Sequence, residues 1–88
     1  MTIRDYNSLR RAIFDEASKL PEVAAALDVS DVVYIYDVTD AKQQHGVLVL
    51  TARSQLNAAV LADNGFDPET ADANLAIKLS RKTKCAIL

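Results

Sequence analysis

Residues 32–38, VVYIYDV, decide the fold class of this chain. They are rich in β-branched and aromatic residues, which favour a strand. Residues 46–51, GVLVLT, predict a second strand, and both stretches are apolar at consecutive positions, as strands covered by helices are. The intervening TDAKQQH is polar and suits a hairpin loop. We therefore expect the two strands to pair antiparallel.

A helix is predicted before this pair, over residues 5–20. Its apolar residues recur three and four positions apart and form one stripe: Tyr6, Leu9, Ile13, Ala17 and Leu20. Pro21 ends or kinks this helix and also fits the first position of a second short one, PEVAAAL. Glu22 would then lie at the positive end of that helix dipole.

Two further helices are predicted after the strand pair. Ser54 can cap a helix that runs to about Asp63, and the Asn64-Gly65 pair is a good helix stop. Asp67 is a natural N-cap and Pro68 suits the first helical position, so the next helix would run through Leu75 and Leu79 to about Lys82.

These elements predict one α+β domain over residues 1–88. A small antiparallel sheet of two or three strands would be packed by helices in the order α-β-β-α-α-(β). The expected core includes Leu9, Ile13, Val60 and Leu75. A chain of 88 residues can bury one modest core.

Charge is unevenly distributed along the chain. Residues 1–77 contain six basic and all twelve acidic side chains, a net charge of −6, whereas residues 78–88 carry four basic side chains and no acid. An acidic body repels nucleic acid, so we do not expect nucleic acid as the partner. Cys85 is the single cysteine, which excludes a disulfide within the chain and favours a reducing, cytoplasmic location. Neither a signal peptide nor a membrane-spanning run is recognisable.

The last residues, 78–88, have two interpretations: a basic tail or a C-terminal edge strand. Cys85-Ala86-Ile87-Leu88 fits a CaaX signal behind a basic run and resembles the prenylated end of some G-protein gamma subunits. That resemblance covers four residues and implies lipidation of Cys85, the one case in which we would expect a membrane. A related alternative is that another peptide-modifying enzyme modifies Cys85, with the folded body as its recognition handle. Alternatively, Thr83–Leu88 is an edge strand of the sheet with two alternate side chains of Cys85–Leu88 pointing into the core, which we favour.

The predicted element order is also that of the type II KH fold, an RNA-binding module. The phosphate-gripping GxxG loop is missing, however, because Pro68 replaces the second glycine beside Asp67 and Glu69. A helix-turn-helix over residues 58–77 is an alternative arrangement. The candidate nucleic-acid contacts are basic, Lys78, Arg81, Lys82 and Lys84.

Tyr34 and Tyr36 lie two apart and so share one face of their strand. If exposed, they could stack on bases or anchor a partner; if covered by a helix, they belong to the core. We favour the core.

Catalytic and metal-binding constellations are not apparent. His45 is the single histidine, and no third group is spaced to form a triad with it and Cys85. Four aspartates surround the first strand without the spacing of a calcium loop, and we interpret them as strand-end and turn aspartates: Asp28, Asp31, Asp37 and Asp40. We expect neither a cofactor nor a metal, and no enzymatic activity.

By elimination, we expect a regulatory domain of the inhibitor or adaptor type that binds another protein of unknown identity. The two alternatives are a folded carrier of a modified Cys85 tail and a nucleic-acid-binding module. A homodimer is a further alternative that the sequence does not decide. The alanine- and aspartate-rich style of the sequence is typical of bacterial or phage proteins.

Overall fold

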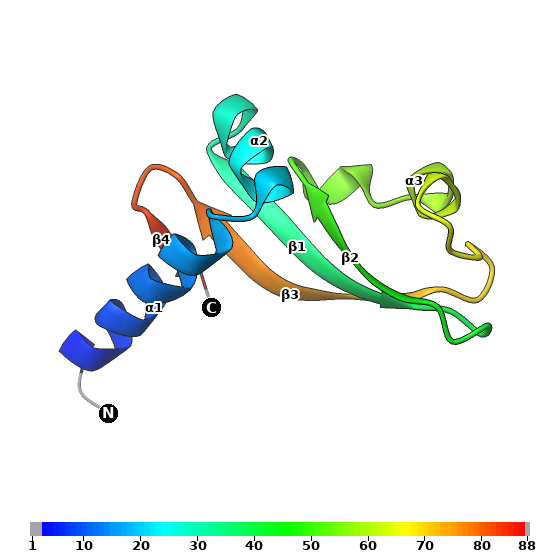
Figure 1. The fold of residues 1–88 in the computed structure, drawn as a ribbon, viewed down its shortest axis with the longest axis horizontal. Helices are drawn as coiled ribbons and strands as arrows, with labels where there is room; N and C mark the ends of the chain where they lie inside the picture. Colours follow the sequence, from blue (N-terminus) through cyan, green and yellow to red (C-terminus); the bar gives the residue numbers. More distant parts are fainter. Residues whose placement is uncertain (1–2, 88) are drawn as a thin grey trace.

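The computed structural model describes residues 3–87, which form a four-stranded antiparallel sheet with helices on both faces (Figure 1). The strands lie in the order β2-β1-β3-β4. Their bounds are β1 Val32–Thr39, β2 His45–Leu50, β3 Asp72–Ser80 and β4 Cys85–Ile87. The helices are α1 Ile3–Ala17, α2 Pro21–Val29 and α3 Ala58–Asp63, with one 3-10 turn at Arg53–Gln55. The predicted α+β class is confirmed, with four strands rather than two or three.

The hairpin of β1 and β2 was predicted correctly. Its register runs from Tyr34 opposite Leu50 to Thr39 opposite His45. The helix start at Pro21 and the stop at Asn64-Gly65 are also confirmed, and Gly65 has the positive φ of 87° that favours glycine. Asn57, not Ser54, caps α3, because its side-chain Oδ1 accepts the Val60 N–H at 2.9 Å.

The helix predicted over residues 67–82 is wrong. The Asp67 carbonyl accepts the N–H groups of Thr70 and Ala71, which closes a single turn, and the chain then extends as β3. Along its whole length β3 pairs with the central strand β1, from Val32 opposite Ser80 to Thr39 opposite Asp72. Long-range pairing and burial thus override the local helical preference of alanine, leucine and lysine. The element order is therefore neither that of a KH fold nor that of a helix-turn-helix.

A β-bulge divides β3 into two halves. Ile77 lies opposite Ile35, but Leu75 lies opposite the next residue, Tyr36, so Ala76 has no partner in β1. Apart from Ala76, the apolar residues of β3 occupy alternate positions, which in a regular strand would all share one face. Because of the bulge, Ile77 and Leu79 face one side of the sheet whereas Ala73 and Leu75 face the other.

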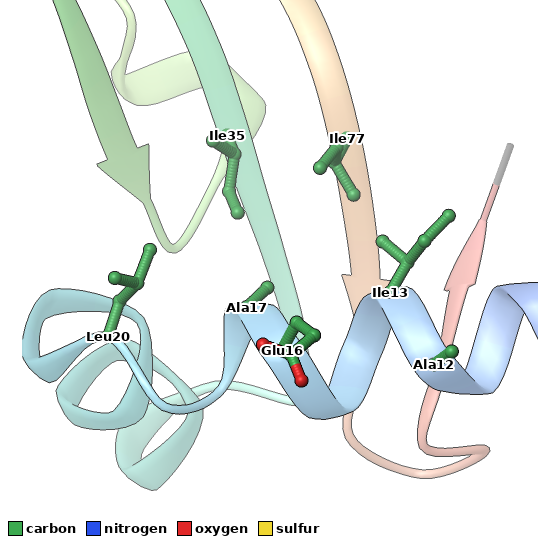
Figure 2. A pocket seen from close by; sticks show the side chains of 7 residues that line it. All are labelled: Ala12, Ile13, Glu16, Ala17, Leu20, Ile35 and Ile77. Atoms are coloured by element: carbon green, nitrogen blue, oxygen red, sulfur yellow. The ribbon is translucent and has the colours of Figure 1, made fainter.

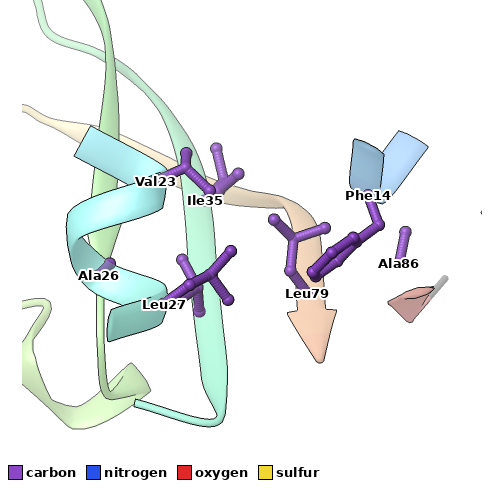
Figure 3. Close-up of a cluster of buried hydrophobic side chains, with 8 residues drawn as sticks. Phe14, Val23, Ala26, Leu27, Ile35, Leu79 and Ala86 are labelled. Atoms are coloured by element: carbon purple, nitrogen blue, oxygen red, sulfur yellow. The ribbon is translucent and has the colours of Figure 1, made fainter. Parts of the chain in front are cut away.

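Two apolar clusters result, one on each face. The first cluster lies under α1 and α2 (Figure 3) and consists of Phe14, Val23, Ala26, Leu27, Val33, Ile35, Leu79 and Ala86. The second lies under α3 and consists of Tyr36, Val38, Leu48, Leu61 and Phe66. Alternate residues of β1 serve the two clusters in turn, which explains why this strand is apolar on both faces. The two clusters are staggered along the sheet, with α1 and α2 towards one end and α3 towards the other (Figure 1). We call the side of α1 and α2 the helix face.

The predicted core is only partly correct. Leu9 and Leu75 are 43% and 40% exposed, while Ile13 and Val60 are half-buried against the two clusters. Phe14, which lies off the predicted stripe, is the buried residue of α1. The reason is that α1 packs through its C-terminal half and runs out beyond the sheet (Figure 1).

Asp40 ties the hairpin loop to the turn before β3. One carboxylate oxygen, Oδ1, accepts the N–H groups of Lys42 and Gln44 at 3.0 and 3.1 Å; the other, Oδ2, accepts that of Asp67 at 2.9 Å. The bond from Asp67 is the main reason why the pKa of Asp40 lies below its ordinary value of 3.8, with those from Gln44 and Lys42 adding to it and burial opposing. A group with a lowered pKa stabilises the fold above its unfolded-state pKa, and this contribution is lost as the pH falls through its folded-state pKa.

β4 is a protected edge strand. It is three residues long, and the carbonyl of Ala86 accepts a hydrogen bond from Arg10 Nε at 2.8 Å. Ala86 is fully buried in the first cluster and Cys85 is 8% exposed. The edge-strand interpretation of the C-terminus therefore holds for Cys85–Ile87, with two adjacent rather than alternate residues buried, and Leu88 lies outside the described residues.

We predict that Asp40→Asn lowers the urea midpoint of unfolding at pH 7, since the amide cannot accept all three N–H groups. The difference from the wild type should shrink between about pH 4 and pH 2, where the wild-type carboxylate becomes protonated. Urea titrations at pH 7, 4 and 2.5 measure this. Asp28→Asn, at an exposed position, is the matched control; an equal loss at every pH would contradict a role for the charge.

We also predict that Cys85 reacts slowly with a thiol reagent in native buffer and at the rate of a free thiol in denaturant. Burial in a packed strand limits access of the reagent to the sulfur. A spectroscopic thiol titration with and without guanidinium distinguishes the two states. Full reactivity in native buffer would show that the C-terminus is a mobile tail.

Candidate functional site

An apolar groove lies between α1 and the sheet (Figure 2). Its volume is about 490 Å³, and we call it the helix groove. All lining residues except Glu16 are apolar, namely Ala12, Ile13, Ala17, Leu20, Ile35 and Ile77. Phe14 is buried in the first cluster, and Ile13 and Ala17 pack against that cluster from the same helix. The groove lies between these side chains and the exposed Leu20, next to Ile35 of β1 and Ile77 of β3 (Figure 2).

A second groove of about 470 Å³ follows the outer edge of β2, and we call it the edge groove. It is lined by Leu20, Glu22, Asn64 and the strand residues 47–50. Leu20 is shared by both grooves and is 52% exposed, and Val47 on the same face of the sheet is 58% exposed. The two grooves together leave an apolar strip uncovered on the helix face.

The helix groove is lined almost entirely by apolar side chains. Its single titratable side chain, Glu16, forms an exposed ion pair with Lys19 at 3.1 Å. An exposed pair of this kind contributes about 0–1 kcal/mol and leaves the carboxylate hydrated. The lining residues therefore offer a partner apolar contact and one solvated carboxylate.

His45 and Cys85 do not come together. His45 begins β2 and bonds Thr39 Oγ1 through Nδ1 at 3.0 Å, whereas Cys85 begins β4, the strand at the opposite edge of the sheet. Within residues 3–87, no three histidine, cysteine or acidic side chains are grouped so that they could hold a metal ion.

The four aspartates around β1 do not form one group, and their surroundings differ. Asp40 holds the hairpin loop, and Asp31 forms an ion pair with Arg81. Asp28 and Asp37 are exposed. The structure thus gives Asp31 and Asp40 separate roles in linking segments of the chain.

Tyr34 and Tyr36 share a face, but their surroundings differ. Tyr36 is buried in the second cluster, where its hydroxyl has no hydrogen-bond partner among the described residues. Tyr34 is half-buried beside this cluster, and the Lys78 ammonium lies 5.6 Å from its ring centre. A cation at this distance over a ring is attracted by the negative face of the π-system.

The four basic residues of the C-terminal segment do not form one surface. Arg81 is used internally, because its guanidinium donates to the Leu27 carbonyl at 2.8 Å and pairs with Asp31. Lys78 lies beside Tyr34, while Lys82 and Lys84 are exposed on the turn between β3 and β4. Two of the four, Lys78 and Arg81, are thus engaged with neighbouring residues of the fold.

The apolar stripe of α1 was identified from the sequence, but the groove beside it was not. Ile13 and Ala17 pack against the first cluster as core residues, while Leu20 stays exposed, and all three line the groove. Ile77 was placed in a helix, so its position opposite Ile35 could not be anticipated.

None of the helices in the described part of the chain combines the length and apolar character needed to cross a membrane. Comparison with known proteins identifies no related family for this chain: no family model matches it, and no curated protein or solved structure gives a significant match.

Proposed function

We propose that this chain is a non-enzymatic, protein-binding domain that holds its partner over the helix groove. The observation that supports this most directly is the apolar lining of the groove, in which Glu16 is the single charged residue. Exposed apolar surface that is contiguous rather than scattered is typical of a docking site for another protein.

The neighbouring side chains extend this surface beyond the groove. Leu20 and Val47 are each more than half exposed and lie on the same face. A partner that covers them would remove apolar area from water, which contributes about 25 cal/mol for each Å² buried. A small polar metabolite would find few hydrogen-bond donors here, whereas an apolar side chain of a protein would fit.

The two alternative functions have less support. A lipidated or otherwise modified tail requires access to Cys85, which is buried in β4. A nucleic-acid module requires converging cations, and Arg81 is already engaged with Asp31 and Leu27. Neither alternative has an observation in its favour comparable to the apolar groove.

We predict that Leu20→Glu strongly reduces capture of the partner. A carboxylate at this position would have to lose its hydration when the groove is covered, which is costly without a pairing cation. The measurement is a pull-down from an extract of the native host, in which the unaltered chain should recover one dominant polypeptide and Leu20→Glu roughly tenfold less.

Val29→Glu is the matched control, because Val29 is 78% exposed at the far end of α2 and lines neither groove. Circular dichroism melting should show that both variants fold. If the two variants captured the polypeptide equally well, the groove would not be the docking surface.

A further inference from the structure

The two edges of the sheet are protected to very different degrees. β4 is short and its Ala86 carbonyl is capped by Arg10. β2 is six residues long and contains no lysine, arginine, acidic residue, proline or bulge, the features with which proteins usually protect an exposed edge. Within residues 3–87, the backbone of β2 forms hydrogen bonds to β1 alone.

The open edge of β2 lies in the edge groove. Leu20 and Glu22, at the start of α2, lie on one side of this groove, and Asn64, at the end of α3, lies on the other. A strand added to a sheet lies about 4.8 Å from its neighbour. The edge groove therefore offers a single extended segment both a row of backbone partners and flanking side chains.

Charge indicates what kind of segment fits. Glu22 lines the groove, Asp37 lies opposite the exposed Val47, and Asp63 directly precedes Asn64. None of these three carboxylates has a hydrogen bond or ion pair within residues 3–87. A second copy of β2, HGVLVL, would bring no lysine or arginine to them. An extended segment with a basic side chain would neutralise Glu22, which lines the groove, in a neighbourhood where the other two carboxylates add negative charge.

We propose that the β2 edge binds an extended, apolar segment of the partner protein that carries lysine or arginine, which adds to the sheet as a fifth strand. The proposal rests on the proposed function and specifies the class of partner. Backbone hydrogen bonds to β2 would provide affinity, and side chains at alternate positions would contact Val47 and Leu20 on one face. The basic side chain would lie near Glu22.

The test begins with random heptapeptides displayed on phage and selected on the full chain. We expect enrichment of alternating β-branched residues with at least one lysine or arginine. A synthetic peptide of the enriched sequence should bind by calorimetry, two- to fivefold more weakly to Glu22→Gln, and with less dependence on salt for that variant.

N-methylation of the peptide tests strand addition directly. Methylating the backbone nitrogens that face β2 should weaken binding at least tenfold, whereas methylating the alternate nitrogens, which face away, should change it little. Equal effects of the two methylated peptides, or selection of amphipathic helical peptides that Leu20→Glu rejects, would overturn strand addition and leave the proposed function standing.

Two other outcomes would also contradict the proposal. If no peptide is enriched and Leu20→Glu still captures the host polypeptide, both proposals fail. If the chain alone doubles its mass in sedimentation at micromolar concentration, and Val47→Lys restores the single-chain mass without lowering the melting temperature, then a second copy occupies the edge.

Discussion

The unpaired residue Ala76 is the constraint on which the rest of the structure depends. By shifting the register of β3 against β1, it turns the two halves of one alternating strand to opposite faces. A small domain with one continuous core would cover one face of its sheet and leave the other to water. Here each face is covered over only part of its length, under α1 and α2 at one end and under α3 at the other.

The same division explains where the exposed apolar surface lies. On the helix face, Phe14 and Ala86 fix α1 against the β4 side, so the helix groove stays open over Ile35 and Ile77. On the opposite face, Phe66 packs so closely on Gly46 that a Cβ there would lie 2.7 Å from the ring, and any other residue would displace it. The sheet is thus tightly packed where the Phe66 ring lies on the Cα of Gly46, whereas a groove stays open on the helix face beside α1.

The hairpin of β1 and β2 could be predicted because its signal is local: two β-branched stretches joined by a polar loop. β3 could not, because Asp67-Pro68 has the local features of a helix start and the strand is specified by pairing with β1 over 32 or more intervening residues. The helix groove was missed for a related reason. Periodicity identified the apolar stripe of α1, but the choice of Phe14 as the buried residue follows from the tertiary contact with β4. Asp40 was recognised only as a turn aspartate, and its bond to Asp67 joins segments 27 positions apart.

The most direct test of this account is the register of β3 in solution, measured by nuclear Overhauser contacts in an isotope-labelled sample. The bulge predicts backbone contacts from Ile77 to Ile35 and from Leu75 to Tyr36, with Ala76 paired to neither. Methyl contacts should then place Leu79 against Phe14, and Ala73 among the residues of the second cluster. An unbroken register that pairs Ala76 with Tyr36, or helical contacts across residues 68–80, would contradict the division of the sheet into two half-covered faces.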